Sequence, residues 1–291
     1  MSSTQLGSGV NVLDGNLGGA FDILSGSAGE NPRLGIGRRY GGASAAYSFR
    51  DIGAEGGAVV NVTRSSDSER RDFSAVQIVD GTLEAFIGAG NNGTIKKWYD
   101  QSGNGKHLIA PTDVAREPTL VSNGSLVTDN GKPALSCNTF EYFTVVDSQS
   151  VNANAFYFVL NVDNPDPSTA RDLMGTVSGN THWFRFTNAD VENVRWNAVS
   201  HTFGTTAENQ QIIISLDIDS SNVLRYFEDG SQSGVDRSGS TGQFVMQRFL
   251  RRTTSTNEFQ GKVQEAIFFD TDQTASRTDI TNEINAYYGA F

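Results

Sequence analysis

The stretch WYDQSGNGKHL, residues 98 to 108, carries the densest local signal in this chain of 291 residues. An aromatic pair is followed by Asp, Gln, Ser, Gly, Asn and Gly, and then by a lone histidine. Asp and Asn side chains accept hydrogen bonds from backbone N–H groups a few residues further on, and glycine tolerates a positive φ. We therefore predict a self-capped structural turn formed by Asp100, Gly103, Asn104 and Gly105.

A metal site is the weaker interpretation of the same loop. Asp100 and Asn104 offer oxygen ligands, but hard cations take six to eight oxygens and this stretch supplies few. The three histidines of the chain are dispersed over about a hundred residues and do not show zinc-ligand spacing. We predict no metal and no cofactor; the histidines are His107, His182 and His201.

Short apolar segments separated by turn residues continue from about residue 43 to about residue 270. Asp229-Gly230 predicts a two-residue hairpin turn, and a brief helix is expected around residues 81–87. About ten strands without βαβ alternation favour two packed antiparallel sheets, so the expected fold class is mainly β. From residue 274 the period becomes helical and Gly289 follows, which predicts a C-terminal helix.

Residues 1–42 differ from the rest, because they hold 11 of the 31 glycines and show no strand or helix period. Apolar residues are scattered along this glycine-rich segment. We predict an extended N-terminal arm that becomes ordered on a neighbouring subunit or partner, followed by one domain over residues 43–291. The predicted docking residues of the arm are Leu13, Leu17, Phe21, Ile23 and Leu24.

Composition excludes several classes of function. The counts of 22 Lys+Arg and 33 Asp+Glu give a net charge of −11, which disfavours binding to nucleic acid or anionic membranes. No apolar run has the length of a membrane span, and the N-terminus lacks the features of a signal peptide. Cys137 is the single cysteine and is expected to be a packed core residue.

Three segments resemble the catalytic domain of the fungal α-L-arabinofuranosidase B family: residues 45–50, 62–67 and 98–108. Residues 259–266 and the final helix resemble the closing elements of the laminin-G-like group. The resemblance implies a concanavalin A-like jelly-roll sandwich of two antiparallel sheets. Similar domains occur in tail-fibre and other virion proteins of bacteriophages.

The family cleaves with one Glu and one Asp, and a retaining glycosidase needs such a pair about 5 Å apart. At the corresponding places this chain reads Thr181–Phe186 and Arg251–Thr256, without a carboxylate. We therefore expect no catalytic residues and a protein that is not an enzyme. Asp190, Glu192 and Glu258 remain as substitutes if the carboxylates are displaced.

Aromatic and basic residues suggest a glycan-binding face. Trp183, Arg185, Arg195 and Trp196 are placed on neighbouring strands, although alternating Trp-Phe-Arg-Phe is also typical of an ordinary half-buried strand. A second basic cluster either docks carboxylates of a neighbouring subunit or is a solvated face. It consists of Arg248, Arg251 and Arg252.

These features predict a non-enzymatic bacteriophage virion protein, either a capsid decoration protein or a tail or fibre component. Its arm would bind other virion proteins, its sandwich would be free to bind a cell-surface glycan, and it would form a homo-oligomer. The predicted location is the virion, after synthesis in the host cytoplasm without a signal peptide. The alternative is an α-L-arabinofuranosidase-like glycoside hydrolase or a free carbohydrate-binding lectin.

Overall fold

The chain divides at residue 30, and its second unit, residues 31–291, is compact. The five predicted docking residues of the arm, from Leu13 to Leu24, lie outside the described residues. The fold is therefore that of the second unit. The computed structural model describes residues 35–53, 56–138, 140–163, 170–187, 191–205, 208–252 and 258–291.

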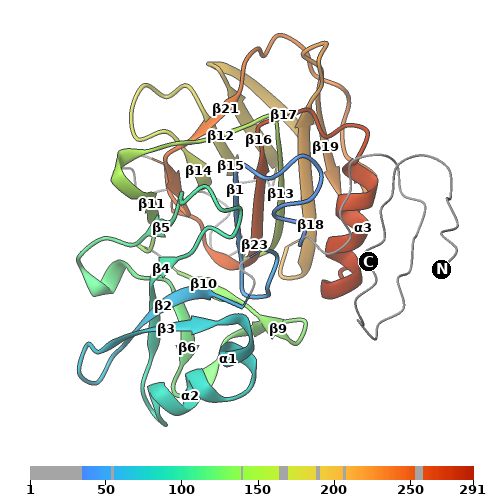
Figure 1. Cartoon of the computed structure of the whole chain (residues 1–291). Coiled ribbons are helices and arrows are strands. Elements are labelled where there is room, and N and C mark those ends of the chain that lie inside the picture. The colour runs from blue at the N-terminus through green and yellow to red at the C-terminus, as the bar shows by residue number, and fades with distance from the viewer. Residues whose placement is uncertain are drawn as a thin grey trace, which may run out of the picture. The chain divides into compact units, whose positions relative to one another are not determined.

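The second unit is mainly β, as predicted, and 19 of its strands join into one continuous antiparallel sheet (Figure 1). One part of this sheet is built around two long neighbouring strands, β13 and β23, which are almost entirely buried. Its strands are β1 (Ala45–Ser48), β10 (Leu135–Cys137), β13 (Ala155–Val162), β18 (Gln211–Ile218), β19 (Leu224–Glu228), β20 (Ser231–Gln232) and β23 (Gly261–Phe269).

A second part of the sheet runs through seven strands that pair in the order β5, β11, β22, β14, β15, β16 and β17. This part positions the candidate site. Their bounds are Leu108–Ile109, Phe143–Val145, Arg248–Phe249, Arg171–Gly175, Trp183–Phe186, Val191–Trp196 and Val199–Thr205, respectively.

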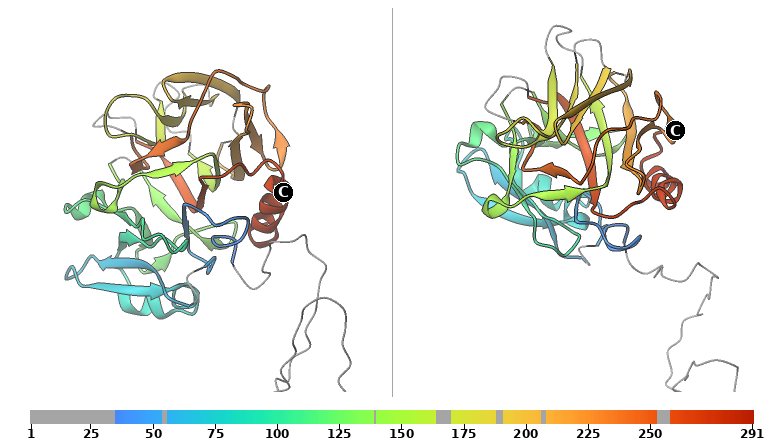
Figure 2. Two further views of the ribbon diagram at one scale, coloured as in Figure 1. Left: turned by 45° about the horizontal axis from the view of Figure 1, so that its top comes forward. Right: turned by 90° about the horizontal axis from the view of Figure 1, so that it is seen from above.

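The remaining elements lie around these two parts. In Figure 1 the helices α1 and α2 lie beside β2, β3 and β6 at the bottom of the view. In Figure 2 the C-terminal helix α3 lies at an edge, and Figure 1 shows it beside β18 and β19. The bounds are β2 (Ala58–Arg64), β3 (Arg70–Ser74), α1 (Ala75–Val79), α2 (Thr82–Ile87), β4 (Gly93–Trp98), β6 (Thr119–Ser122), β7 (Ser125–Leu126), β8 (Thr128–Asp129), β9 (Lys132–Pro133), β12 (Val151–Ala153), β21 (Phe244–Met246) and α3 (Arg277–Tyr288).

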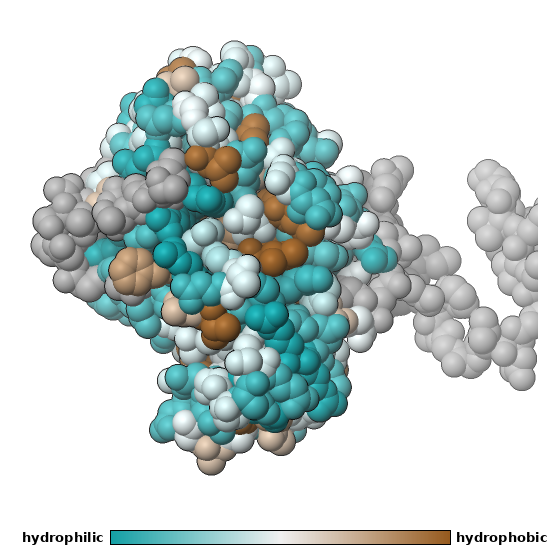
Figure 3. All heavy atoms as spheres, turned by 90° about the vertical axis from the view of Figure 1, so that its left-hand side faces the viewer, coloured by the Kyte–Doolittle hydropathy of each residue, from teal (hydrophilic) through white to brown (hydrophobic). Residues whose placement is uncertain are grey.

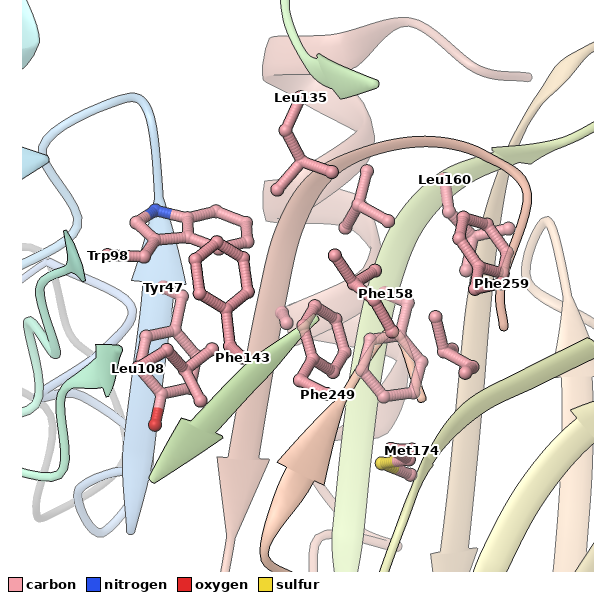
Figure 4. Close-up of a cluster of buried hydrophobic side chains, with 14 of the residues drawn as sticks. Tyr47, Trp98, Leu108, Leu135, Phe143, Phe158, Leu160, Met174, Phe249 and Phe259 are labelled. Atoms are coloured by element: carbon pink, nitrogen blue, oxygen red, sulfur yellow. The ribbon is translucent and has the colours of Figure 1, made fainter. Parts of the chain in front are cut away.

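The two parts of the sheet face one another across a shared aromatic core. The ring of Phe158 on β13 lies 6.2 Å from that of Phe184 on β15. It lies 6.0 Å from that of Phe249 on β22, and Figure 4 shows these two rings side by side. Such ring pairs contribute about 0.5–1.5 kcal/mol each beyond the burial of their area. The packing is that of a β-sandwich, whereas the finer jelly-roll connectivity stays a prediction.

Several local predictions are confirmed. Asp229 and Gly230, with φ of 48° and 75°, form the turn between β19 and β20. The helix α3 ends at Gly289 with a left-handed cap, and Cys137 is buried with a free thiol. Among the described residues, no helix is long and apolar enough to cross a membrane.

The first described residues pack onto the folded unit, although we assigned residues 1–42 to the arm. Ile36 is buried in a core cluster with residues of β13 and α3. The N–H of Gly37 donates to the carbonyl of Ile52 at 2.8 Å, and Arg39 forms an ion pair with Glu283 at 2.9 Å. Residues 35–42 are thus a part of the fold, while an arm before them stays a prediction.

The face seen in Figure 3 is mostly hydrophilic, and its hydrophobic residues form small separate patches. Patches of this kind are normal on a soluble protein and do not by themselves indicate a partner. The polar side chains of the sheet are therefore the better candidates for a functional site.

Candidate functional site

The Asp100 loop uses its polar groups to hold the backbone. Asp100 Oδ1 accepts hydrogen bonds from the N–H groups of Ala46 and Ser102, both at 2.9 Å, and Oδ2 accepts from that of Lys106 at 3.0 Å. His107 Nδ1 accepts from the Asp100 N–H, and burial lowers the pKa of this imidazole. Both oxygens of the carboxylate are therefore engaged by the fold.

The rest of the loop has the same character. Asn104 donates to the carbonyl of Ala43 at 2.9 Å, while Gly103 and Gly105 adopt φ of 92° and 69°, which other residues rarely accept. In the described part of the chain, no group of three or more His, Cys, Asp or Glu side chains is arranged to hold a metal. The geometry is that of a structural turn joining β4 and β5 to β1.

A second cluster of polar residues lies on the outward face of β14, β15 and β16. Phe184 and Phe186 point into the core, so Trp183 and Arg185 project to the opposite face because side chains alternate along a strand. The pairing register places Arg195 directly opposite Trp183. Three of the four residues predicted to bind glycan therefore share one face.

Trp196 does not belong to this face, and its inclusion in the predicted set is corrected. Its indole is completely buried, stacks on Phe156 with centroids 6.3 Å apart, and donates to the carbonyl of Gly242 at 2.8 Å. The physical reason is the strand period of two, since Trp196 and its neighbour Arg195 must point to opposite faces. The alternation of side chains along the strand was therefore the sequence signal that assigns Trp196 to the core and Arg195 to the outward face.

Asp172 on β14 is a site residue that the sequence analysis missed. It is 0 % exposed, accepts a hydrogen bond from Arg185 Nε at 2.7 Å, and its Oδ2 lies 3.3 Å from Arg252 Nε. Burial raises the pKa of Asp172, against the two guanidinium groups, which lower it. Within the described part of the chain, its Oδ2 accepts no hydrogen bond.

Glu258 is the second buried carboxylate at this place. An isolated backbone bridge pairs it with Asp172, and Arg251 Nε lies 3.4 Å from its Oε1. The other two substitutes are less suited to a pair with Asp172: Glu192 is buried and accepts from the Gly204 N–H at 2.9 Å, and Asp190 lies outside the described residues. Two residues with buried carboxylates, 86 positions apart in the sequence, are thus neighbours through a backbone bridge.

Three arginines contact this carboxylate pair and two more lie on the neighbouring strands of the same face, and we call the five the arginine patch. Arg185 and Arg252 flank the ring of Trp183, with their guanidinium carbons 4.3 Å and 5.7 Å from its centroid. Arg248 and Arg251 flank the ring of Tyr142, both at 5.1 Å from its centroid. Trp183 is only 7 % exposed, so its ring supports guanidinium groups rather than offering a face on which a sugar can stack. The patch consists of Arg185, Arg195, Arg248, Arg251 and Arg252.

The register of the sheet explains how the patch is assembled. Arg248, Gly175, Trp183 and Arg195 lie opposite one another on β22, β14, β15 and β16 and form one row across the sheet. A Cβ atom on Gly175 would meet the carbonyl oxygen of His182 at 2.5 Å and Arg252 Cγ at 3.0 Å. Glycine at this position therefore leaves the space in which Arg252 reaches Asp172.

Comparisons with known proteins find relatives of the fold only. No family model and no curated protein matches the chain. A GH54 α-L-arabinofuranosidase soaked with a cyclic sulfate inhibitor matches with a TM-score of 0.61 and 15% identity, over 84% of this chain and 63% of that chain. A mutant of a GH54 α-L-arabinofuranosidase soaked with 4-nitrophenyl α-L-arabinofuranoside matches with a TM-score of 0.62 and the same identity and coverage.

A third structure, an arabinofuranosidase complexed with arabinofuranosyl-α-1,2-xylobiose, matches with a TM-score of 0.60 and 15% identity, over 84% of this chain and 62% of that chain. The chain spans less than two thirds of the length of these proteins. The comparison confirms a sandwich like that of arabinofuranosidase B. At this identity it shows the shared fold.

Two predictions are corrected by this finding. The prediction of a non-enzymatic bacteriophage virion protein is wrong, because the matched structures are glycoside hydrolases and favour the carbohydrate-active alternative. The prediction that the chain is not an enzyme is contradicted by the same structures. A virion location, virion partners and homo-oligomer formation are tested by none of these observations and stay predictions.

Proposed function

We propose that this chain is a glycoside hydrolase that uses Asp172 and Glu258 as its pair of carboxylates. The observation that carries the proposal is the backbone bridge that joins these two buried residues beside the arginine patch. Glycoside hydrolysis requires two carboxyl groups flanking the scissile bond, one protonated and one ionised. The likeness in fold to arabinofuranosidases supports the same class of reaction.

The two carboxyl groups have different surroundings, which suits two different roles. Asp172 is assigned as the general acid, because burial raises its pKa and its Oδ2 accepts no hydrogen bond. It would transfer its proton to the leaving-group oxygen as the glycosidic bond breaks. Glu258, held by Arg251, would stabilise the positive charge that develops at the anomeric carbon. It would also accept a proton from the water molecule whose oxygen bonds to that carbon as the leaving group departs.

The experiment measures release of reducing sugar from arabinan, arabinoxylan and uronate-containing polysaccharides, together with hydrolysis of 4-nitrophenyl α-L-arabinofuranoside. Asp172→Asn and Glu258→Gln should each lower kcat on the best substrate by about 10²–10⁴-fold, the usual contribution of a general acid or base. Tm and circular dichroism identify any variant that fails to fold.

Asp217→Asn is the matched control. Asp217 is equally buried, contacts two arginines and also has a pKa raised by burial, but it belongs to β18, which pairs with none of the strands of the candidate site. This variant should keep its activity. Lack of turnover by the wild type on every substrate would contradict the hydrolase proposal, and equal losses in Asp217→Asn and Asp172→Asn would contradict the assigned pair.

A further inference from the structure

The arginine patch contains two guanidinium groups without an anionic partner. Among the described residues, neither Arg195 nor Arg248 forms an ion pair or a side-chain hydrogen bond, and the Nε atoms of both are buried without an acceptor. Arg248 lies over the ring of Tyr142, 5.1 Å from its centroid, and burial lowers its pKa. Both side chains are half-buried.

The surroundings of Asp172 add to this excess of positive charge. Arg185 and Arg252 share the single carboxylate of Asp172, and the charge of Arg195 acts on Arg252 as well. Burial lowers the pKa of Arg252, and its two neighbouring arginines lower it further, although Asp172 raises it. Three guanidinium groups therefore act around one carboxylate, in a protein whose net charge is −11.

Such an arrangement costs free energy unless a ligand completes it. Removing a charged group from water is unfavourable when no opposite charge replaces the water, and like charges at close range add to the cost. A guanidinium group presents a planar fork of donors that matches a carboxylate or a sulfate with two hydrogen bonds. The aromatic rings of the patch are already covered by arginines, so charge rather than stacking is the recognition element that the patch offers.

We propose that the substrate bound here is an anionic oligosaccharide, whose carboxylate or sulfate groups are held by Arg195 and Arg248. This inference rests on the proposed function and names its substrate class. The two arginines are separated by three strand spacings along one row, or about 14 Å, which is wider than a single sugar ring. The ligand therefore carries at least two anionic groups on different sugar residues.

The test is isothermal titration of the Glu258→Gln protein, in which turnover is expected to be blocked, with three probes. These are an oligogalacturonide, the same oligosaccharide after its carboxyl groups are reduced to neutral galactose, and a sulfated galactan oligosaccharide. An anionic probe should bind, with an affinity that falls as salt is added, and the reduced probe should bind at least about tenfold more weakly because charge-assisted hydrogen bonds are lost. The two anionic probes distinguish carboxylate from sulfate.

Variants then locate the site. Arg195→Gln and Arg248→Gln should each weaken binding of the anionic probe by about tenfold or more, as expected for loss of a charge-assisted hydrogen bond. Arg71→Gln is the control, because Arg71 is exposed on β3 and packs on the ring of Phe73. It should bind like the parent protein.

Three results would overturn the inference: equal affinity for the neutral and the anionic probe, no binding of either anionic probe, or unchanged affinity in both patch variants. None of them affects the proposed function, which depends on turnover. A neutral substrate that is cleaved by the wild type and not by Asp172→Asn would leave the hydrolase standing and remove only the anionic substrate class.

Discussion

Two buried aspartates of this protein have nearly the same immediate surroundings. Asp172 and Asp217 are both almost completely buried, each lies close to two arginines, and burial raises the pKa of both. At Asp217, the guanidinium of Arg277 lies 2.8 Å from Oδ2 and that of Arg225 lies 3.9 Å from Oδ1. The arginines in direct contact with each carboxylate would by themselves give the two aspartates the same role.

The difference lies one contact further out. Arg225 is also paired with Asp219 at 2.9 Å and Asp236 at 3.3 Å, so three carboxylates surround two arginines. Around Asp172 the ratio is reversed, since Arg185 and Arg252 share one carboxylate and the charge of Arg195 acts on Arg252. The Asp217 cluster balances its own charge and is structural, whereas the Asp172 cluster lacks negative charge and is suited to receive it from a ligand.

Breaking the Asp217 cluster should have the largest effect. Arg225→Gln removes a partner from Asp217, Asp219 and Asp236 at once and should lower the free energy of unfolding by about 3 kcal/mol, the lower bound for breaking a buried ion pair. Urea unfolding measures the change. A loss below about 0.5 kcal/mol, the range of a surface substitution, would show that the cluster is not structural.

A change of pH should have the next largest effect and acts beside the arginine patch. Burial lowers the pKa of His182 to about 4, below the value near 6.5 of an unfolded histidine. The unfolded chain therefore binds a proton that the folded chain does not, and the contribution of His182 to stability falls by about 1.4 kcal/mol per pH unit as the pH is lowered from 6.5 toward 4.

The measurement compares urea unfolding of the wild type and His182→Asn at pH 7 and pH 5. The variant keeps an acceptor for the Asn197 N–H, which His182 Nδ1 accepts at 3.3 Å. The variant should lose less stability between pH 7 and pH 5, because it lacks the histidine whose protonation favours the unfolded chain. The buried carboxyl groups that also titrate are the same in both proteins, so their effect cancels in the comparison. Identical losses would show that His182 titrates normally in the folded state.

Removing an unpaired charge from the patch should have the smallest effect and the opposite sign. Arg195→Gln relieves repulsion with Arg252 and the cost of a half-buried cation, so the free energy of unfolding should rise by about 0.5–1 kcal/mol. Arg71→Gln, on the exposed strand β3, should stay within about 0.5 kcal/mol of the wild type. Destabilisation by Arg195→Gln would mean that this arginine is already satisfied.

Local chemistry made part of this structure predictable. The turn at Asp229-Gly230, the helix before Gly289 and the polar loop after Trp98 depend on residues close together in the sequence, and each was found where it was expected. The alternation of Trp183 with Phe184 likewise placed Trp183 and Arg185 on one face.

The carboxylate pair could not be predicted in the same way. Asp172 follows Arg171 at the start of β14, where two adjacent charged residues break the alternation that identifies a strand. Its partner Glu258 comes from a segment 86 positions later, so only the pairing of distant strands brings the two together. The excess of arginine over carboxylate depends on the same long-range register, which the sequence pattern does not contain.

The thermal stability of the Glu258→Gln protein, in which turnover is expected to be blocked, with and without the further substitution Arg195→Gln and with and without an oligogalacturonide, tests most directly whether the arginine patch is built for an anionic ligand. Without ligand, the protein with Arg195→Gln should have the higher Tm, because it lacks an unpaired cation. At a ligand concentration of about 100 Kd the protein that keeps Arg195 gains about 2.7 kcal/mol and should become the more stable of the two. If the protein with Arg195→Gln is already the less stable one without ligand, or if the order does not reverse on adding ligand, the account is contradicted.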